Sequence, residues 1–239
     1  DIYDNHIRTP NKYYTWGWNK LNLNNVEKKN TSAFYNLKCS GNKVFDKNFN
    51  FQNKIVFYGP HFYRRRHFWD VFRLNKSLYN NQFIFLRKLI PELQNIISIK
   101  MGNKFLKETK IEFNKINKSF KNFLNFKPIY KHENLLSVFS YDSTGFYEHL
   151  CLNKPVIMYY NFDHSDLNDN AKYFYDELKK VNIIHSSPSE AAEFINNNYN
   201  NLINWWYSYE TQMIINDFNN NFNKYTKDPI KNMIEEFKL

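Results

Sequence analysis

Short apolar runs alternate with segments of helical periodicity along most of the chain. Apolar runs of roughly four to seven residues lie at 55–59, 95–101, 135–141, 155–160 and 182–185. Runs of this length, bounded by Gly, Pro, Asn or Lys, are typical of buried strands. Apolar residues at helical spacing predict helices over 77–92, 104–124, 143–153 and 166–180, and from 188 to near 225.

The helix that follows the last apolar run has the clearest start signal. Ser187 is a favourable N-cap, Pro188 suits the first helical position, and Glu190 completes a capping box. The alternation of strands and helices predicts an α/β fold. We expect a Rossmann-like, doubly wound and mostly parallel sheet, followed by C-terminal helices.

The predicted Rossmann-like domain occupies residues 51–225. Residues 1–50 are an irregular aromatic and polar segment, in which 12–20 is expected to form a short aromatic strand or a buried turn. Residues 226–239 are a polar tail. Ligands of doubly wound sheets bind beyond the carboxyl ends of the strands, so we expect a site in the loops after the first three runs.

The charge balance favours an anionic partner. The chain has a formal net charge of +10 and a pI near 9.3, which suits nucleotides, phosphates, nucleic acid or an acidic membrane face. Asn and Lys are abundant while Gly numbers only 5, as in translations of AT-rich genomes. We therefore treat neither Asn nor Lys as an individual signal, and nucleic acid becomes a less favoured partner.

Several classes of protein are not indicated by the sequence. No apolar run approaches the ~18 residues of a membrane span, and the N-terminus lacks the pattern of a signal peptide. A bacterial cytoplasmic location is therefore expected, with peripheral contact at the inner membrane left open. The two cysteines lie far apart, without metal-ligand spacing, so we expect neither a metal nor a cofactor. Because the first residue is not Met, we expect a fragment of a longer protein.

The turn after the run 135–141 carries the first set of candidate binding residues: Asp142, Ser143, Thr144, Gly145 and Glu148. The unpaired N–H groups of a first helical turn, two hydroxyls and a glycine together suit a phosphate. Glu148 lies one turn further, where a carboxylate could accept hydrogen bonds from ribose hydroxyls. The alternative is an ordinary helix start, capped by Asp142 or Ser143, with Glu148 complementing the helix dipole. Both interpretations remain open from the local pattern.

A basic segment follows the first strand and supplies a second set of candidates. Arg64, Arg65 and Arg66 lie in "HFYRRRHFW", and arginine pairs with phosphate through two parallel hydrogen bonds. Lys100 ends another strand and could meet the same phosphate. A solvated basic loop is the competing interpretation. His61, His67 and Arg66 are weak candidates for catalytic roles, and the catalytic base is otherwise unassigned.

The order of these motifs resembles a known family. "YDSTGFYEHLCLNKPVIMYYN" followed by "AKYFYDELKKVNIIHSSPSEAAEFINNNYNNLINWW" is similar to the C-terminal part of a transferase family from bacterial surface-carbohydrate and O-antigen loci. "YTWGW" and "YRRRHFW" resemble its earlier part. Members of the family look like GT-B glycosyltransferases. The resemblance covers nearly the whole chain and is strongest over 138–225.

The resemblance implies the donor-binding half of a metal-independent GT-B enzyme that uses a nucleotide-sugar as substrate. Ser143, Thr144 and helix amides would hold the diphosphate, and Glu148 the ribose. Arg64–Arg66 and Lys100 would be charge partners. The acceptor would be a saccharide or a lipid-linked molecule, and the N-terminal acceptor domain that supplies the base would lie outside this chain.

Two alternatives remain beside this interpretation. A transferase of the same architecture could use CMP-Kdo or a CDP-polyol phosphate. A non-enzymatic basic module could instead bind nucleic acid or a membrane, with its Lys and Arg residues spread over one face.

Overall fold

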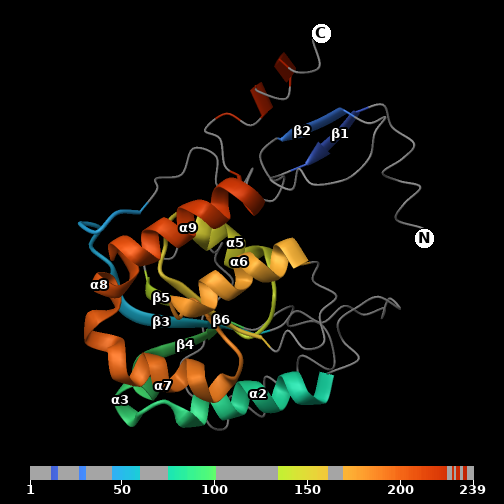
Figure 1. Ribbon diagram of the computed structural model, residues 1–239. Coiled ribbons are helices and arrows are strands. Elements are labelled where there is room, and N and C mark those ends of the chain that lie inside the picture. The colour runs from blue at the N-terminus through green and yellow to red at the C-terminus, as the bar shows by residue number, and fades with distance from the viewer. Residues whose placement is uncertain are drawn as a thin grey trace.

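The computed structural model (Figure 1) describes most of the predicted domain. The described residues are 12–15, 27–30, 45–59, 75–100, 134–160, 169–224, 228, 230–231 and 234–235. Strands β1 (Lys12–Thr15) and β2 (Glu27–Asn30) form a separate, parallel two-stranded sheet. A short strand or a buried turn was expected within 12–20, and β1 is the strand; β2 lies in a segment that was predicted to be irregular.

The main sheet has five parallel strands. They are β3 (Gln52–Tyr58), β4 (Ile97–Lys100), β5 (Asn134–Phe139), β6 (Val156–Tyr159) and β7 (Ile184–His185). The strands lie side by side in the order β4-β3-β5-β6-β7, and every pair is parallel. This is one of the two common orders of doubly wound folds. The predicted Rossmann-like α/β fold is therefore confirmed.

Helices cover both faces of the main sheet (Figure 1). One face packs against α2 (Asn75–Lys88), α3 (Pro91–Ile96) and α7 (Pro188–Asn198). The opposite face packs against α5 (Thr144–Cys151), α6 (Asp169–Lys180) and α9 (Tyr209–Phe222), and α8 (Leu202–Trp206) joins the two layers. Among the described residues, no helix is both long enough and apolar enough to cross a membrane.

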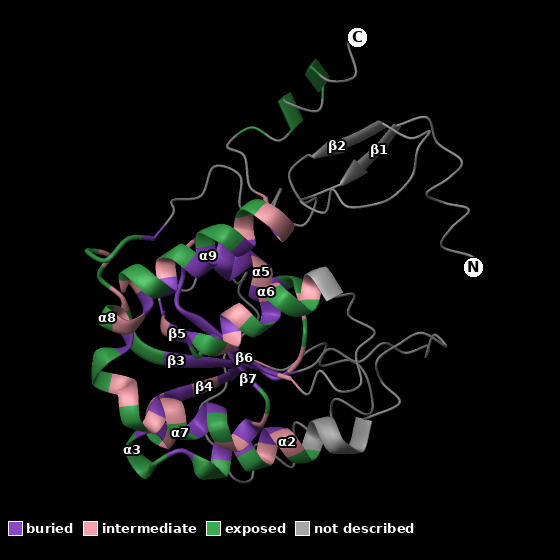
Figure 2. Ribbon diagram, viewed as in Figure 1, coloured by how far each residue is buried: buried purple, intermediate pink, exposed green. Residues whose placement is uncertain are grey.

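The core is divided between these two faces because side chains alternate along each strand. Ile55 and Phe57 of β3 face the α2/α7 layer, while Val56 and Tyr58 face the α5/α9 layer. Phe57 stacks on Phe85 of α2 with ring centroids 5.3 Å apart. All four of these β3 residues are buried, and Figure 2 shows the central strands buried between the helices. Burial on both faces explains the nearly continuous apolar runs in the sequence.

Two helix boundaries differ from the predictions for physical reasons. Pro91 does not lie near the end of one helix over 77–92 but begins a second helix, α3. The residue before it, Ile90, is extended with φ −63° and ψ 153°, as expected before proline. The helix predicted from 188 to near 225 is interrupted by a 3-10 turn at Tyr199–Asn201 and again at Ser208, which caps α9. The helix predicted over 104–124 lies outside the described residues.

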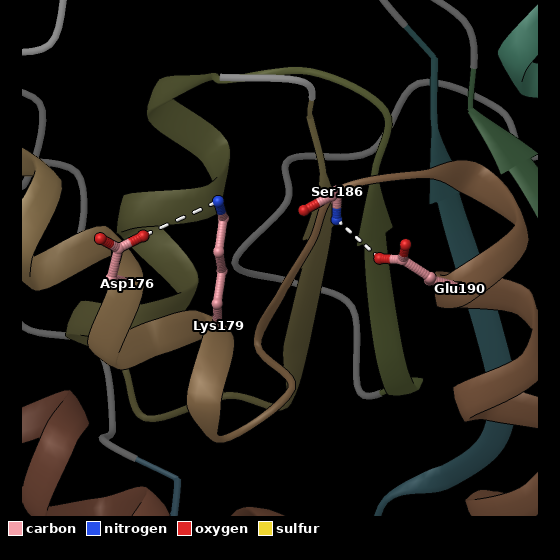
Figure 3. Close-up of polar contacts among 4 residues, drawn as sticks. All are labelled: Asp176, Lys179, Ser186 and Glu190. Atoms are coloured by element: carbon pink, nitrogen blue, oxygen red, sulfur yellow. Dashed lines mark hydrogen bonds and ion pairs between the residues drawn. The ribbon is translucent and has the colours of Figure 1, made fainter. Parts of the chain in front are cut away.

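The capping box at the start of α7 is confirmed with one modification. Ser187 Oγ accepts a hydrogen bond from the Glu190 backbone N–H at 3.1 Å. The Glu190 carboxylate accepts the N–H of Ser186, one residue before the N-cap, at 3.0 Å (Figure 3). Figure 3 also shows the Asp176–Lys179 ion pair in the last turns of α6, with an N–O distance of 3.8 Å. The ion pair belongs to the β6–α6–β7 crossover, and the capping box begins the helix that follows β7.

Helices α5 and α6 end in the same way, with an asparagine in the left-handed conformation. Asn153 has φ 53° and Asn182 has φ 60°. After α5, the N–H of Asn153 bonds to the Leu150 carbonyl and the N–H of Lys154 to the His149 carbonyl. The corresponding bonds follow α6. Both ends are Schellman motifs, which favour Gly or Asn at this position.

The paired tryptophans lie at the amino edge of the sheet, where the parallel strands begin. Trp206 is fully buried, and its Nε1 donates to Asn153 Oδ1 at 3.0 Å. Trp205 Nε1 donates to the Val181 carbonyl at 2.8 Å. Asn153, Trp205 and Trp206 therefore form one structural unit, which ties the C-terminal helices to the ends of α5 and α6.

Candidate functional site

The strand order changes direction at β3. The chain moves from β3 to β4 on one side of β3 and then crosses to β5 on the other side. The next described helix after β3 is α2 on one face of the sheet, and α5 follows β5 on the opposite face; ligands of doubly wound folds bind at such a switch point. The Ser140 backbone N–H and hydroxyl both donate to the Tyr58 carbonyl, at 3.4 and 3.3 Å. The Gly59 N–H donates to the Lys100 carbonyl at 2.9 Å. These bonds fix the ends of β4, β3 and β5 together.

The start of α5 lies directly beyond β5, at residues 142–145. Ser143 occupies the N-cap position with φ −146° and ψ 153°, but its side chain makes no capping hydrogen bond. The Ser143 Oγ is buried and has no hydrogen-bond partner within the described part of the chain. The first N–H groups of a helix have no acceptor inside the helix. Unlike α7, helix α5 therefore starts without the serine cap that the simpler interpretation predicted.

Within the described part of the chain, the Asp142 side chain makes no hydrogen bond to the first turn of α5 either. Its Oδ1 accepts a hydrogen bond of 2.6 Å from the hydroxyl of Tyr147. Tyr175 of α6 donates in turn to the Tyr147 hydroxyl, since that proton is already used. Burial raises the pKa of Tyr147 well above its ordinary value, and the Asp142 charge raises it further. The phenol therefore stays protonated and holds the carboxylate beside the helix start.

A buried histidine anchors the first turn of α5 to the sheet. His149 Nδ1 lies 2.7 Å from the Gly145 carbonyl, and Nε2 lies 2.8 Å from Ser137 Oγ. Because a carbonyl only accepts, Nδ1 carries the proton and Nε2 accepts from Ser137. Asn134 Nδ2 donates to the same serine oxygen at 2.9 Å. Sequence reasoning missed this network, although the spacing of four residues between Gly145 and His149 was a readable signal.

Lys100 and Glu148 are brought together at the switch point from distant parts of the sequence. Glu148 is buried on α5, and its negative charge acts on both Lys100 and Tyr58. Burial lowers the pKa of Lys100, and the charge of Glu148 opposes that change. The Lys100 Nζ lies 5.5 Å from the centre of the Tyr58 ring, which stacks on Phe139 at 4.5 Å. Lys100 and Glu148 thus share one environment, beside the stacked rings of Tyr58 and Phe139.

The remaining predicted residues are not placed. His61, His67 and Arg64–Arg66 lie outside the described residues, so their roles stay predictions. Within the described ranges, no group of three or more His, Cys, Asp or Glu side chains is arranged to hold a metal ion.

The geometry suits a ligand that is anionic at one end and hydroxylated at the other. A helix N-terminus with a buried serine hydroxyl provides hydrogen-bond donors and positive potential for an anion. Lys100 adds a cationic group at the end of β4. The Glu148 carboxylate provides acceptors on the same side of the sheet, which suit hydroxyl groups.

Comparison with known proteins gives one match. A family model described as LIC12162 family transferase matches residues 2–237, nearly the whole chain. A search among curated proteins finds no match. The resemblance to a transferase family is thereby confirmed at the level of the reaction class. The chain belongs to the LIC12162 family of transferases.

Proposed function

We propose that this transferase uses a nucleotide-activated sugar as donor and acts as a GT-B-like glycosyltransferase in bacterial surface polysaccharide assembly. The observation that carries the proposal is the uncapped start of α5 at the switch point, with Ser143 Oγ buried and unpartnered among the described residues. Lys100 and Glu148 lie at the same place. Together, the start of α5, Lys100 and Glu148 suit a diphosphate joined to a ribose better than they suit a polyanion.

In this proposal the first turn of α5 binds the diphosphate of the donor. The backbone N–H groups of the turn and the hydroxyls of Ser143 and Thr144 donate to phosphate oxygens. When the sugar is transferred, negative charge develops on the phosphate that leaves. Fixed donors and the Lys100 ammonium stabilise that charge more than they stabilise the ground state, which lowers the barrier. No metal is required for this step, and Arg64–Arg66 would add further positive charge.

Glu148 positions the nucleoside in the same proposal. Its buried carboxylate would accept hydrogen bonds from ribose hydroxyls, and His149 would keep the helix start in place through the Gly145 carbonyl. The base that activates the acceptor hydroxyl would come from a domain outside this chain, with His61 and His67 as weaker candidates. The acceptor would be a saccharide or a lipid-linked molecule.

A pair of serines offers a sharp test. Ser187→Ala removes a real cap from α7 and should lower the free energy of unfolding by about 1 kcal/mol. Ser143→Ala removes no capping bond and should leave the stability of the free protein almost unchanged.

The melting temperature of the native protein should rise with at least one of CMP, CDP, UDP and GDP. A ligand at about 100 times its Kd adds about 2.7 kcal/mol of stability. Ser143→Ala and Glu148→Gln should reduce this shift, and Ser187→Ala should preserve it.

The same panel distinguishes the alternatives. A preference for CMP or CDP would favour a Kdo or polyol-phosphate donor bound at the same helix start. If no nucleotide changes the melting temperature, while polyanions raise it with a steep salt dependence, the chain is a basic binding module. If Ser143→Ala destabilises the free protein as much as Ser187→Ala does, the helix start is an ordinary cap.

A further inference from the structure

A row of polar side chains crosses the ends of three strands on the α2/α7 face of the sheet. Tyr159 of β6 pairs in register with His185 of β7. Ser140 continues β5 beside Tyr159, because the preceding pair in register is Phe139 and Met158. The Tyr159 ring lies against Phe85 of α2 at 5.4 Å, so the row faces helices α2 and α7.

Helix α2 adds a fourth polar side chain above this row. Gln82 continues the buried stripe formed by Phe85, Leu86 and Leu89, at spacings of three, four and seven residues. It lies one turn before Phe85, which contacts Tyr159. Since α2 begins at the carboxyl ends of the strands and runs back along the sheet, Gln82 is on the side of Phe85 nearer to those ends. The stripe is therefore apolar along the sheet and polar where the strands end.

The hydrogen-bonding capacity of this group is largely unused. Gln82 Oε1 and Nε2, Tyr159 Oη and His185 Nε2 are all buried, and none has a hydrogen-bond partner in the described ranges. Their exposed fractions are 0%, 2% and 6%. The Ser140 hydroxyl lies beside the Tyr159 phenol and lowers its pKa, against the larger effect of burial, while its own proton is donated to the Tyr58 carbonyl. Buried polar groups normally find partners, and leaving them unpaired lowers stability. Four such atoms in one layer indicate that something else pairs with them.

The chemistry of the group selects an uncharged partner. Burial lowers the pKa of His185 to about 4, although the charge of Glu190 opposes the change, so the imidazole is neutral at pH 7. Burial also raises the pKa of Tyr159 well above its ordinary value. An amide, a phenol and a neutral imidazole offer donors and acceptors without net charge. The rings of Phe85 and Phe194 adjoin them, which gives the mixture of polar groups and aromatic faces typical of small-molecule sites.

We propose that Gln82, Tyr159 and His185 bind an uncharged, hydroxyl-rich group between the sheet and helices α2 and α7. This group is the sugar of the donor, an assignment that rests on the proposed function. Ser140 connects the two sites along the chain, since it ends the row and lies three residues before Ser143. The α5 start would hold the phosphates on one face of the sheet edge, and the polar row would hold the sugar on the other.

The first test concerns the free protein. If the Tyr159 hydroxyl forms its hydrogen bond only with a bound ligand, Tyr159→Phe should leave the melting temperature of the free protein unchanged or raise it. Tyr207→Phe is the matched control, because the Tyr207 hydroxyl donates to the Asn153 carbonyl at 3.1 Å and its loss should lower the melting temperature. If Tyr159→Phe lowers it as much as Tyr207→Phe does, the Tyr159 hydroxyl is already paired within the folded chain, and the proposal is wrong.

The second test uses methyl glycosides of glucose, galactose, mannose, rhamnose and N-acetylglucosamine, with glucuronic acid as the charged comparison. At least one neutral glycoside should raise the melting temperature of the native protein. Tyr159→Phe and Gln82→Leu should each abolish that shift, while Tyr207→Phe should keep it. No shift with any glycoside, or equal shifts in every variant, would overturn the proposal. Nucleotides that lack the transferred sugar, such as CMP, CDP, UDP and GDP, test the α5 start separately, so the two proposals can fail independently.

Discussion

Two histidines are buried among the described residues, His149 and His185, and their rings have different hydrogen-bond partners. Both ring nitrogens of His149 have partners, Ser137 on one side and the Gly145 carbonyl on the other. His185 has an unpartnered Nε2 among the described residues, and burial lowers its pKa to about 4. The local sequence hardly distinguishes them, because each has one apolar and one polar neighbour in the chain. Their difference comes from which side chains the fold brings against each ring.

His185 predicts a specific dependence of stability on pH. Its ordinary pKa of 6.5 falls to about 4 in the folded protein, so the unfolded chain binds its proton at a higher pH. Neutral His185 therefore favours the folded state fully above pH 6.5. As the pH falls toward 4, the free energy of unfolding decreases by an amount on the order of 3 kcal/mol. Urea unfolding of the native protein and of the His185→Phe variant across this pH range measures the decrease in the free energy of unfolding. The variant should show the weaker loss in acid, and parallel curves would contradict the prediction.

At the scale of elements, the C-terminal ends of the helices were harder to predict from the sequence than the N-terminal starts. The Ser187–Pro188 start of α7 was predicted from sequence and is confirmed. Asn153 and Asn182 end α5 and α6 in the left-handed conformation, but the abundance of asparagine in this chain hides that signal. The strand ends were predicted within a few residues, because burial on both faces makes each run uniformly apolar.

Asn153 does more than adopt its backbone conformation. Its Oδ1 accepts hydrogen bonds from Trp206 Nε1 and Gln212 Nε2, both at 3.0 Å. Asn153→Gly keeps the conformation and loses these bonds, so it should lower the free energy of unfolding by about 1–3 kcal/mol. Asn153→Ala should cost about 1 kcal/mol more, because alanine resists a positive φ.

The control is Asn182→Gly, since the Asn182 residue is exposed and has a similar φ of 60°. It should change the free energy of unfolding by no more than about 0.5 kcal/mol. Chemical unfolding of the three variants supplies the comparison. Equal losses for Asn153→Gly and Asn182→Gly would show that the Asn153 side-chain bonds are unimportant.

At the scale of the whole molecule, the two edges of the sheet carry different kinds of residues. The amino edge carries the Trp206–Asn153 contact and the bond from the Phe45 N–H to the Leu152 carbonyl, both of which join distant segments. The carboxyl edge carries Lys100, Glu148 and the start of α5. The contacts at the amino edge hold the fold together, and the proposed binding residues lie at the carboxyl edge.

This separation predicts that stability and binding can be altered independently. Trp206→Phe removes a fully buried indole and its Nε1 bonds to Asn153, and should lower the free energy of unfolding by about 2–4 kcal/mol. The rise in melting temperature caused by a nucleotide should be unchanged, because the helix start lies at the opposite edge. A reduced rise in a variant that remains folded at the assay temperature would show that the edges are coupled.

The candidate site was predictable only in part. The alternation of strands and helices places Ser143 and Lys100 at carboxyl ends, and so at one edge of the sheet. It does not reveal that β5 rather than β4 lies beside β6, nor that Glu148 acts on Lys100. Those relations depend on the order of the strands in space, which periodicity along the chain does not encode. Tyr147 and His149 were missed because a phenol or imidazole inside a helix pattern is usually just part of the core.

The pairing of β3 with β5 also bears on how the protein reaches its fold. Ile55 is paired with Leu136, roughly eighty residues away, and closing so long a loop carries a large entropic cost before any contact rewards it. Contacts of this separation slow folding. During synthesis, β3 leaves the ribosome long before its central partner exists. We therefore expect the switch point to assemble late, and the open edge of β3 to be prone to aggregation until β5 pairs with it.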